Sequence, residues 1–144
     1  MLFIGTLIAL WSFMRFLIAD DEKDFATFLS IMIEDAGHEV AEVVALGGMS
    51  VLRAYSECRP DVVMMDIMMP QLNGVTSTRQ ILSKDPDARV VMMSGMLDSK
   101  ALQLTAANAG AVGVLHKPFS QVQFKELIAG LCAQSGANAM PLTR

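Results

Sequence analysis

The apolar run VVMM at positions 62–65, followed directly by Asp66, constrains the fold of this chain more than any other stretch. Pro60 precedes the run, and Pro70 and the pair Asn73-Gly74 follow it with residues that favour turns. A short apolar run without alternation predicts a strand that is buried on both faces, as in a parallel sheet. Because Asp is rarely buried, we expect Asp66 to face solvent at the carboxyl end of this strand, where α/β sheets bind ligands.

Strands and helices are expected to alternate along the rest of the chain. Apolar runs predict strands and apolar residues at helical spacing predict helices, with Gly37 and Gly110 ending two of the helices. The expected strands are 16–19, 39–45, 62–65, 89–93 and 112–115, and the expected helices are 24–36, 47–58, 74–83, 99–109 and 122–131. This order predicts an α/β fold, in which a five-stranded parallel sheet carries helices on both faces.

The length of 144 residues is enough for one domain with its own core. We expect that domain at 14–133, followed by a flexible tail at 134–144. The net charge is -4 and the 11 Lys and Arg residues are scattered, so the chain has no basic stripe. Nucleic acid is therefore not expected as a direct partner.

The first 13 residues are apolar but fit no standard targeting segment. They lack the basic start and the small-residue cleavage site of a secretory signal, and they are shorter than the ~20 apolar residues of a spanning helix. Segment 1–13 can be a tag, an upstream start-site artefact, or an anchor or partner-binding helix. We expect a cytoplasmic protein, with membrane association through 1–13 as the alternative.

Polar residues follow four of the five expected strands. Asp20-Asp21 follow the first strand, Asp66 the third, Ser94 the fourth and Lys117 the fifth. Because the carboxyl ends of parallel strands lie at one edge of a sheet, these side chains are expected to meet in one crevice. Each residue alone is more often a helix cap, a turn residue or a solvated charge, so their convergence carries the prediction.

Three clustered carboxylates need a positive partner. Two like charges about 4 Å apart repel by roughly 4 kcal/mol at an effective dielectric constant near 20. Oxygen ligands alone suit Mg²⁺, and no His or Cys is placed to form a zinc site. With Lys117 as a second positive charge and Ser94 as a hydroxyl donor, the set predicts a site that places a phosphoryl group on Asp66.

From Met14 to about Ala133 the sequence resembles the receiver domain of bacterial two-component response regulators. The matching segments are FLIADDE at 16–22, DVVMMDIMMPQLNG at 61–74, VMMSG at 91–95 and GAVGVLHKPF at 110–119. The resemblance implies a flavodoxin-like sheet with strand order 2-1-3-4-5. It also implies a signalling protein that catalyses only its own phosphorylation and dephosphorylation.

The resemblance also implies a role for each residue of the site. Asp66 would accept a phosphoryl group from a sensor histidine kinase or a phosphotransfer protein. Asp20, Asp21, Asp66 and the backbone carbonyl of Met68 would hold Mg²⁺, and Ser94 and Lys117 would bind the phosphoryl oxygens. The peptide bond between Lys117 and Pro118 would be cis.

Signal output depends on features outside the acceptor site. Many receivers have, where this chain has Val114, an aromatic residue that turns inward on activation. The expected contact face for a downstream protein, or for a second copy, comprises 99–109, 112–115 and 122–131. The chain would act as a stand-alone receiver, or as the front of a longer regulator.

Other classes fit less well. Asp20-Asp21-Glu22 stand where a dinucleotide-binding domain needs glycines, and Met68 stands where haloacid-dehalogenase-type phosphatases have a second Asp. A receiver that binds partners without phosphorylation stays as the alternative. His38 and His116 are expected to be surface residues without a catalytic role.

Overall fold

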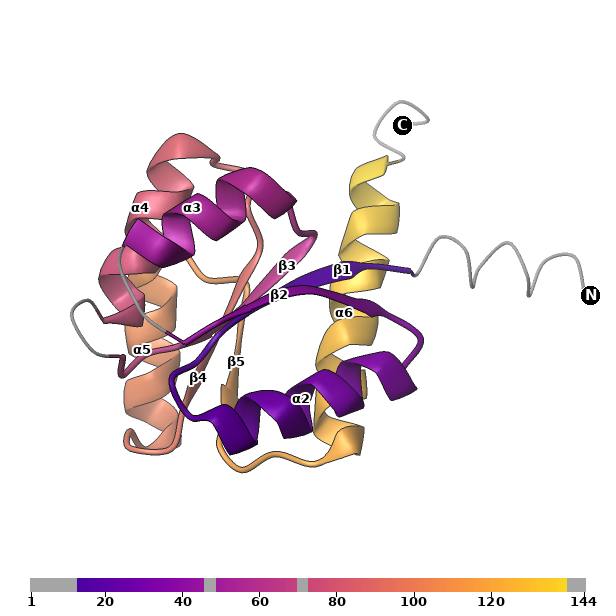
Figure 1. Ribbon diagram of the computed structural model, residues 1–144, viewed down its shortest axis with the longest axis horizontal. Coiled ribbons are helices and arrows are strands. Elements are labelled where there is room, and N and C mark those ends of the chain that lie inside the picture. Colours follow the sequence, from indigo (N-terminus) through magenta and orange to yellow (C-terminus); the bar gives the residue numbers. More distant parts are fainter. Residues whose placement is uncertain (1–12, 46–48, 70–72, 140–144) are drawn as a thin grey trace, which may run out of the picture. The chain divides into compact units, whose positions relative to one another are not determined.

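The computed structural model describes residues 13–45, 49–69 and 73–139 (Figure 1). Apart from Phe13, the predicted N-terminal segment 1–13 lies outside these ranges, as do residues 140–144 of the predicted tail. In the described ranges, none of the helices combines the length and the apolar character needed to cross a membrane.

The five strands form one parallel sheet. Their order is β2-β1-β3-β4-β5, which confirms the predicted flavodoxin-like fold class (Figure 1). The strands are β1 (Arg15–Ala19), β2 (Glu39–Val44), β3 (Val62–Asp66), β4 (Val90–Ser94) and β5 (Gly113–His116). All residues of β3 and β4 are buried, whereas the edge strands β2 and β5 have partly exposed residues. The apolar runs therefore form the central strands, as a parallel sheet with covered faces requires.

Helices cover both faces of the sheet. Leu17, Val63 and Met92 point to one face and join a core with residues of α3 (Met49–Cys58), α4 (Gly74–Lys84) and α5 (Ser99–Ala109). Helix α2 (Lys23–Asp35) lies on the other side of the sheet from α3 and contacts β1 and β2 (Figure 1). Alternation of side chains along each strand divides the core between the two faces.

Caps set the helix ends close to the predicted positions. The Asn73 side chain accepts from the Thr76 N–H at 2.9 Å, and the Asp98 side chain accepts from the Ala101 N–H at 2.8 Å. Gly110 ends α5 with a φ of 90°, a conformation in which glycine meets no steric cost.

Within the described residues, 119–139 belong to a unit separate from 14–118 and form helix α6 (Gln121–Ala139). Ser120 and Gln123 cap its start reciprocally, because Ser120 Oγ accepts from the Gln123 N–H and Gln123 Oε1 accepts from the Ser120 N–H. The helix runs past the expected end at 131. Three alanines between 133 and 139 favour helix, and the first proline after Pro118 is Pro141.

His38 anchors the start of β1. Its Nδ1 accepts from the Met14 N–H at 3.1 Å, and its ring lies 5.5 Å from the ring of Phe16. Burial lowers the pKa of His38 below 6.5, because the charged imidazole is less well solvated there. The residue serves the fold at the edge of the sheet away from Asp66.

The lowered pKa predicts a loss of stability in acid. The unfolded chain takes up the His38 proton more readily, so the contribution of His38 to the free energy of unfolding rises with pH up to about 6.5 and then levels off. Asp66, whose pKa is raised, acts in the opposite direction over this range, so only the difference between the two proteins reports on His38. His38→Gln should flatten this dependence between about pH 7 and 5.5. Because the ring is partly exposed, the difference should stay well below the ~1.4 kcal/mol of a full pKa unit. Denaturant titrations of both proteins over this range measure it, and parallel curves would contradict the assignment.

Candidate functional site

The four predicted strand ends meet at one edge of the sheet. Asp20 directly follows β1, Asp66 ends β3, Ser94 ends β4 and Lys117 directly follows β5. Pairing of β4 with β5 continues at this edge, where the Lys117 N–H donates to the Ser94 carbonyl at 2.9 Å. The structure thus brings together the side chains that the sequence placed in one crevice.

Three carboxylates form the centre of this site. Oxygens of Asp20, Asp21 and Asp66 all lie within 4.8 Å of one another. Asp21 is exposed, Asp20 is fully buried, and the side chain of Asp66 is 6% exposed. The expectation that Asp66 faces solvent was therefore wrong: β3 is a central strand, and side chains from neighbouring strand ends cover its last residue.

Lys117 holds the carboxylates together. Its Nζ lies 2.8 Å from Asp20 Oδ2, 2.9 Å from Glu22 Oε1 and 3.7 Å from Asp66 Oδ2. The ammonium also lies 4.3 Å from the centre of the Phe25 ring, within range of a cation–π contact. Sequence reasoning missed Glu22 and Phe25 as partners of this lysine. The acidic run at 20–22 was a signal for Glu22, but nothing in the sequence distinguished Phe25 from a core residue.

Burial and neighbouring charges shift the pKa values of Asp66 and Lys117. Burial, and then the neighbouring Asp20 carboxylate, raise the pKa of Asp66 to about 7, although Lys117 acts in the opposite direction. Burial lowers the pKa of Lys117, but Asp20 and Glu22 offset this effect and its pKa is raised overall. Three carboxylates, those of Asp20, Glu22 and Asp66, thus lie within 4 Å of the single Lys117 ammonium.

Ser94 organises the loop that follows β4. It is 1% exposed, and its Oγ accepts from the N–H groups of Met96 at 3.1 Å and Leu97 at 3.2 Å. His116 Nε2 lies 2.8 Å from the Leu97 carbonyl oxygen, so β5 also contacts this loop. A hydroxyl can donate its proton while its oxygen accepts, so Ser94 can still donate to a bound oxyanion.

Gly74 allows helix α4 to begin directly against the acceptor strand. A Cβ at this position would overlap the Asp66 carbonyl oxygen and lie 2.9 Å from its carbonyl carbon. The Gly74 N–H donates to the Ile67 carbonyl at 2.7 Å, which closes the loop between β3 and α4. Only a residue without a side chain fits this approach.

The residues present fit a magnesium ion. Opposite ligands of an octahedral Mg²⁺ are about 4.2 Å apart, twice the usual metal–oxygen distance, so small side-chain movements bring three oxygens into range. Asp20 Oδ2 is buried and lies 2.8 Å from Lys117 Nζ, while Asp21 beside it is exposed. A cluster with oxygen ligands alone suits a hard cation.

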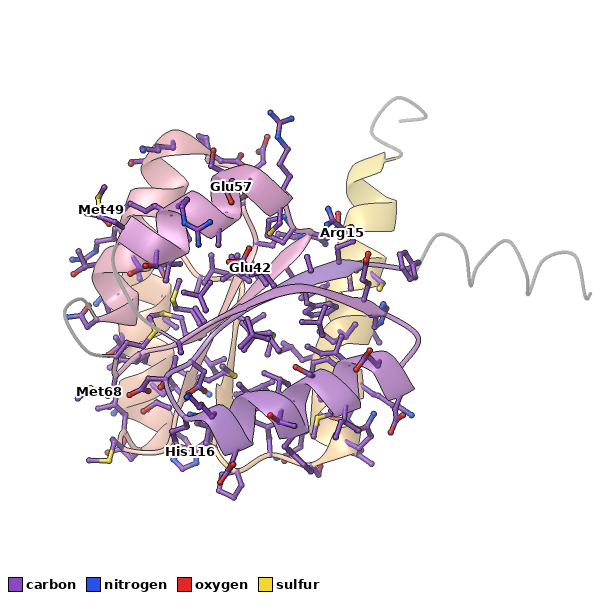
Figure 2. All side chains as sticks on the ribbon, viewed as in Figure 1. Arg15, Glu42, Met49, Glu57, Met68 and His116 are labelled. Atoms are coloured by element: carbon purple, nitrogen blue, oxygen red, sulfur yellow. The ribbon has the colours of Figure 1, made fainter. Side chains whose placement is uncertain are left out.

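Met68 lies at the same end of the sheet (Figure 2). Its N–H donates to Asp66 Oδ1 at 3.4 Å, while its side chain is mostly exposed. Its carbonyl remains a predicted metal ligand. The peptide bond between Lys117 and Pro118 is cis, as the resemblance implied.

Comparison with known proteins decides the family. The model of the response regulator receiver domain matches residues 16–129. The chain belongs to the response regulator receiver family. A chemotaxis protein CheY from Thermotoga maritima is 36% identical over 114 residues, which cover 79% of this chain and 93% of that protein. CheY from Bacillus subtilis is also 36% identical, over 118 residues, with the same coverage of both chains.

Solved structures show the same relationship. A two-component response regulator of the LuxR family from Aurantimonas sp. SI85-9A1 has a TM-score of 0.76 and 30% sequence identity. The match covers 84% of this chain and 86% of that chain. Receiver domains of this family are signalling domains and not classical enzymes, and this chain is such a domain.

The receiver departs from the expected pattern at Val114. This residue lies on β5, where it is half-buried and packs against the core on the side of α3, α4 and α5. A valine cannot swing a ring between exposed and buried positions. The inward turn of an aromatic ring therefore has no counterpart at this position.

Proposed function

We propose that this receiver accepts a phosphoryl group on Asp66 from a histidine kinase or a phosphotransfer protein, and that the modification changes its contacts with other proteins. The position of Asp66 beside Lys117 and two further carboxylates supports this proposal. A buried carboxylate, Asp66, has Lys117 Nζ at 3.7 Å and an oxygen in the same cluster as those of Asp20 and Asp21. Packing alone does not account for three clustered carboxylates with a single lysine among them.

Transfer begins with attack by an Asp66 oxygen on phosphorus. An O–P bond forms, the P–N bond of the donor phosphohistidine breaks, and its electron pair stays on the imidazole nitrogen, which takes up a proton. The Lys117 ammonium and the Ser94 hydroxyl are placed to bind the phosphoryl oxygens. Lys117 already pairs with Asp20 and Glu22, so it is held near Asp66 before the donor arrives.

Asp20, Asp21 and Asp66 would hold Mg²⁺, with the Met68 carbonyl as a further ligand. When bound, Mg²⁺ supplies positive charge that offsets the carboxylates and the incoming phosphoryl oxygens. The chain's own residues orient this arrangement. The Asp20 N–H donates to the Val44 carbonyl at 3.0 Å, and Asp20 Oδ1 accepts from the Glu22 N–H at 2.9 Å.

Incubation with acetyl phosphate tests the function directly. We expect one phosphoryl group per chain in the presence of Mg²⁺ and none in the presence of a chelator, measured by intact mass spectrometry. If the protein is never labelled, the proposal fails in favour of a receiver that binds partners without phosphorylation.

Removal of Asp21 should weaken Mg²⁺ binding and, separately, stabilise the metal-free protein. Asp21→Ala takes away one oxygen ligand and should weaken Mg²⁺ binding tenfold or more, as measured by calorimetry. Because it also relieves repulsion among the carboxylates, the melting temperature of the metal-free protein should rise. Asp24→Ala is the matched control, since this exposed residue in the first turn of α2 lies outside the cluster. An unchanged Mg²⁺ titration for Asp21→Ala would argue against the ligand assignment.

The proposed partners follow from this reaction. The donor is a sensor histidine kinase or a phosphotransfer protein, which we place with the receiver in the cytoplasm. The proposed output face includes α5 and β5, where the side chains of Leu104 on α5 and Val112, just before β5, are exposed. A downstream protein or a second copy of the chain would contact this face.

A further inference from the structure

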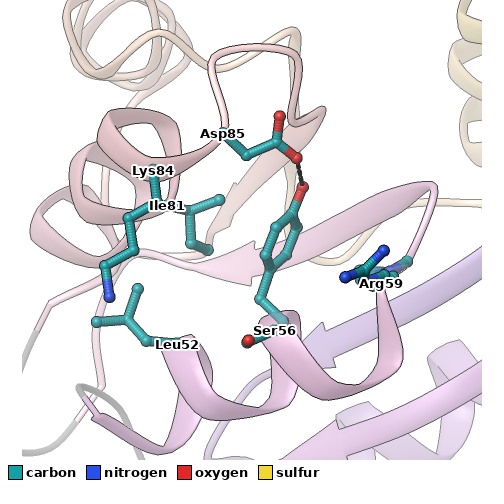
Figure 3. Close-up of a pocket in the computed structure, with 8 residues that line it drawn as sticks. Leu52, Ser56, Arg59, Ile81, Lys84 and Asp85 are labelled. Atoms are coloured by element: carbon teal, nitrogen blue, oxygen red, sulfur yellow. Dashed lines mark hydrogen bonds between the residues drawn. The ribbon is translucent and has the colours of Figure 1, made fainter.

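A hollow lies between α3 and α4 at the edge of the sheet opposite Asp66 (Figure 3). It is formed where these helices end, next to the residues that lead into β3 and β4. Its volume of about 400 Å³ falls within the range of sites that bind small molecules. None of the proposed phosphorylation residues lines it.

The hollow is lined by both apolar and polar side chains, and the one carboxylate among them already accepts hydrogen bonds. Leu52 and the ring of Tyr55 supply most of the apolar surface, with the nearly buried Ile81 beneath them. The Tyr55 hydroxyl donates to Asp85 Oδ2 at 2.6 Å, and Asp85 Oδ1 accepts from the Asp87 N–H at 3.1 Å. Burial and the neighbouring Asp85 raise the pKa of Tyr55, so its hydroxyl stays protonated and keeps donating. Both oxygens of Asp85 are therefore satisfied without a cation.

Two cationic side chains at the rim of the hollow have no ion-pair partner in the described part of the chain. Arg59, which follows α3, and Lys84, at the end of α4, both line the hollow and lie well apart in the close-up (Figure 3). Within the described residues neither side chain forms an ion pair. Arg53, on α3, differs because it pairs with both Glu42 and Glu57. Two cations and one anion, Asp85, thus line the hollow, so its charged side chains leave a net positive charge.

The backbone at Arg59 adds a second observation. Its φ is 45°, in the left-handed region, and its N–H donates to the Tyr55 carbonyl at 3.0 Å just after α3 ends at Cys58. Glycine is the usual residue at such a helix end, because a Cβ there is sterically disfavoured. Arg59 ends the helix less favourably than glycine would, yet it places a guanidinium at the rim.

We propose that this hollow binds a small organic carboxylate with an aromatic or aliphatic body. The body would lie on Leu52, Ile81 and the Tyr55 ring, and the carboxylate would pair with Arg59 or Lys84. Guanidinium and ammonium groups bind carboxylates through charge-assisted hydrogen bonds, and Arg can do so with two parallel bonds. Binding here is separate from phosphorylation of Asp66.

Titration of the nitrogen-15-labelled full chain with naphthoate, followed by NMR, tests this site. We expect saturable shifts centred on α3 and α4 near Tyr55 and Asp85, and at least tenfold weaker binding of naphthamide, the neutral analogue. The double variant Arg59→Gly/Lys84→Gln should also bind naphthoate at least tenfold more weakly. Arg59→Gly alone should not lower the melting temperature, because glycine adopts the left-handed conformation freely.

Arg53→Gln is the matched control, since it removes a cation from the same helix outside the hollow. It should bind naphthoate like the unmodified chain. Equal affinity for naphthoate and naphthamide, full affinity in the double variant, or shifts centred elsewhere would each overturn the proposal. So would the absence of saturable binding at tens of millimolar naphthoate.

Discussion

The Asp66→Asn variant is expected to lose all labelling by acetyl phosphate while it keeps the fold. The amide has no anionic oxygen to attack phosphorus, and Asp20, the other carboxylate of the cluster beside Lys117, is the proposed metal ligand. Asn is close in size to Asp, so the packing around β3 should be preserved. Replacement of the carboxylate also removes repulsion with Asp20, so the metal-free variant should melt at a higher temperature than the unmodified chain.

Mass spectrometry and thermal melting measure both effects. Asp24→Asn serves as the control, because it removes one negative charge from an exposed position of α2 and should leave labelling unchanged. Undiminished labelling of Asp66→Asn would show that another residue accepts the phosphoryl group. In that case the proposed binding of the phosphoryl oxygens by Lys117 and Ser94 would also be wrong.

Gly74→Ala is expected to destabilise the protein by about 2–3 kcal/mol. The new methyl group would overlap the Asp66 carbonyl oxygen and lie 2.9 Å from the Ile67 Cα, and neither is the movable end of a flexible side chain. Helix α4 must therefore shift away from β3, which also disturbs the loop between them. We expect slower labelling of Asp66 in addition to the lower free energy of unfolding.

Gly130→Ala makes the same chemical change in a different setting. Gly130 lies within α6, and a Cβ there would meet nothing within 4 Å. Ala favours helix over Gly by about 0.5–1 kcal/mol, so this variant should be slightly more stable. In denaturant titrations, the free energy of unfolding should therefore fall for Gly74→Ala and rise for Gly130→Ala. A Gly74→Ala protein as stable as the unmodified chain would mean that α4 does not need its close approach to β3.

The sequence by itself determined the strands, the order of elements and the edge at which the polar residues meet. These features follow from local patterns: the apolar runs at 62–65 and 90–93 leave no exposed face, and glycine or proline follows most elements. Parallel strands then place Asp20, Asp66, Ser94 and Lys117 together without further information. The resemblance to receiver domains, carried by short segments around these residues, pointed to the same site.

Only the tertiary structure decided how these residues are surrounded. Asp66 was expected in solvent but is buried, because its exposure depends on neighbouring strands and on a lysine 51 positions later in the chain. Glu22 and Phe25 contact Lys117 only after α2 and β5 have packed on the sheet. The unpaired cations of the hollow between α3 and α4 likewise come from two separate helix ends. Such contacts join segments far apart in sequence, and no local pattern encodes them, since burial and pairing are set by the packing of whole elements.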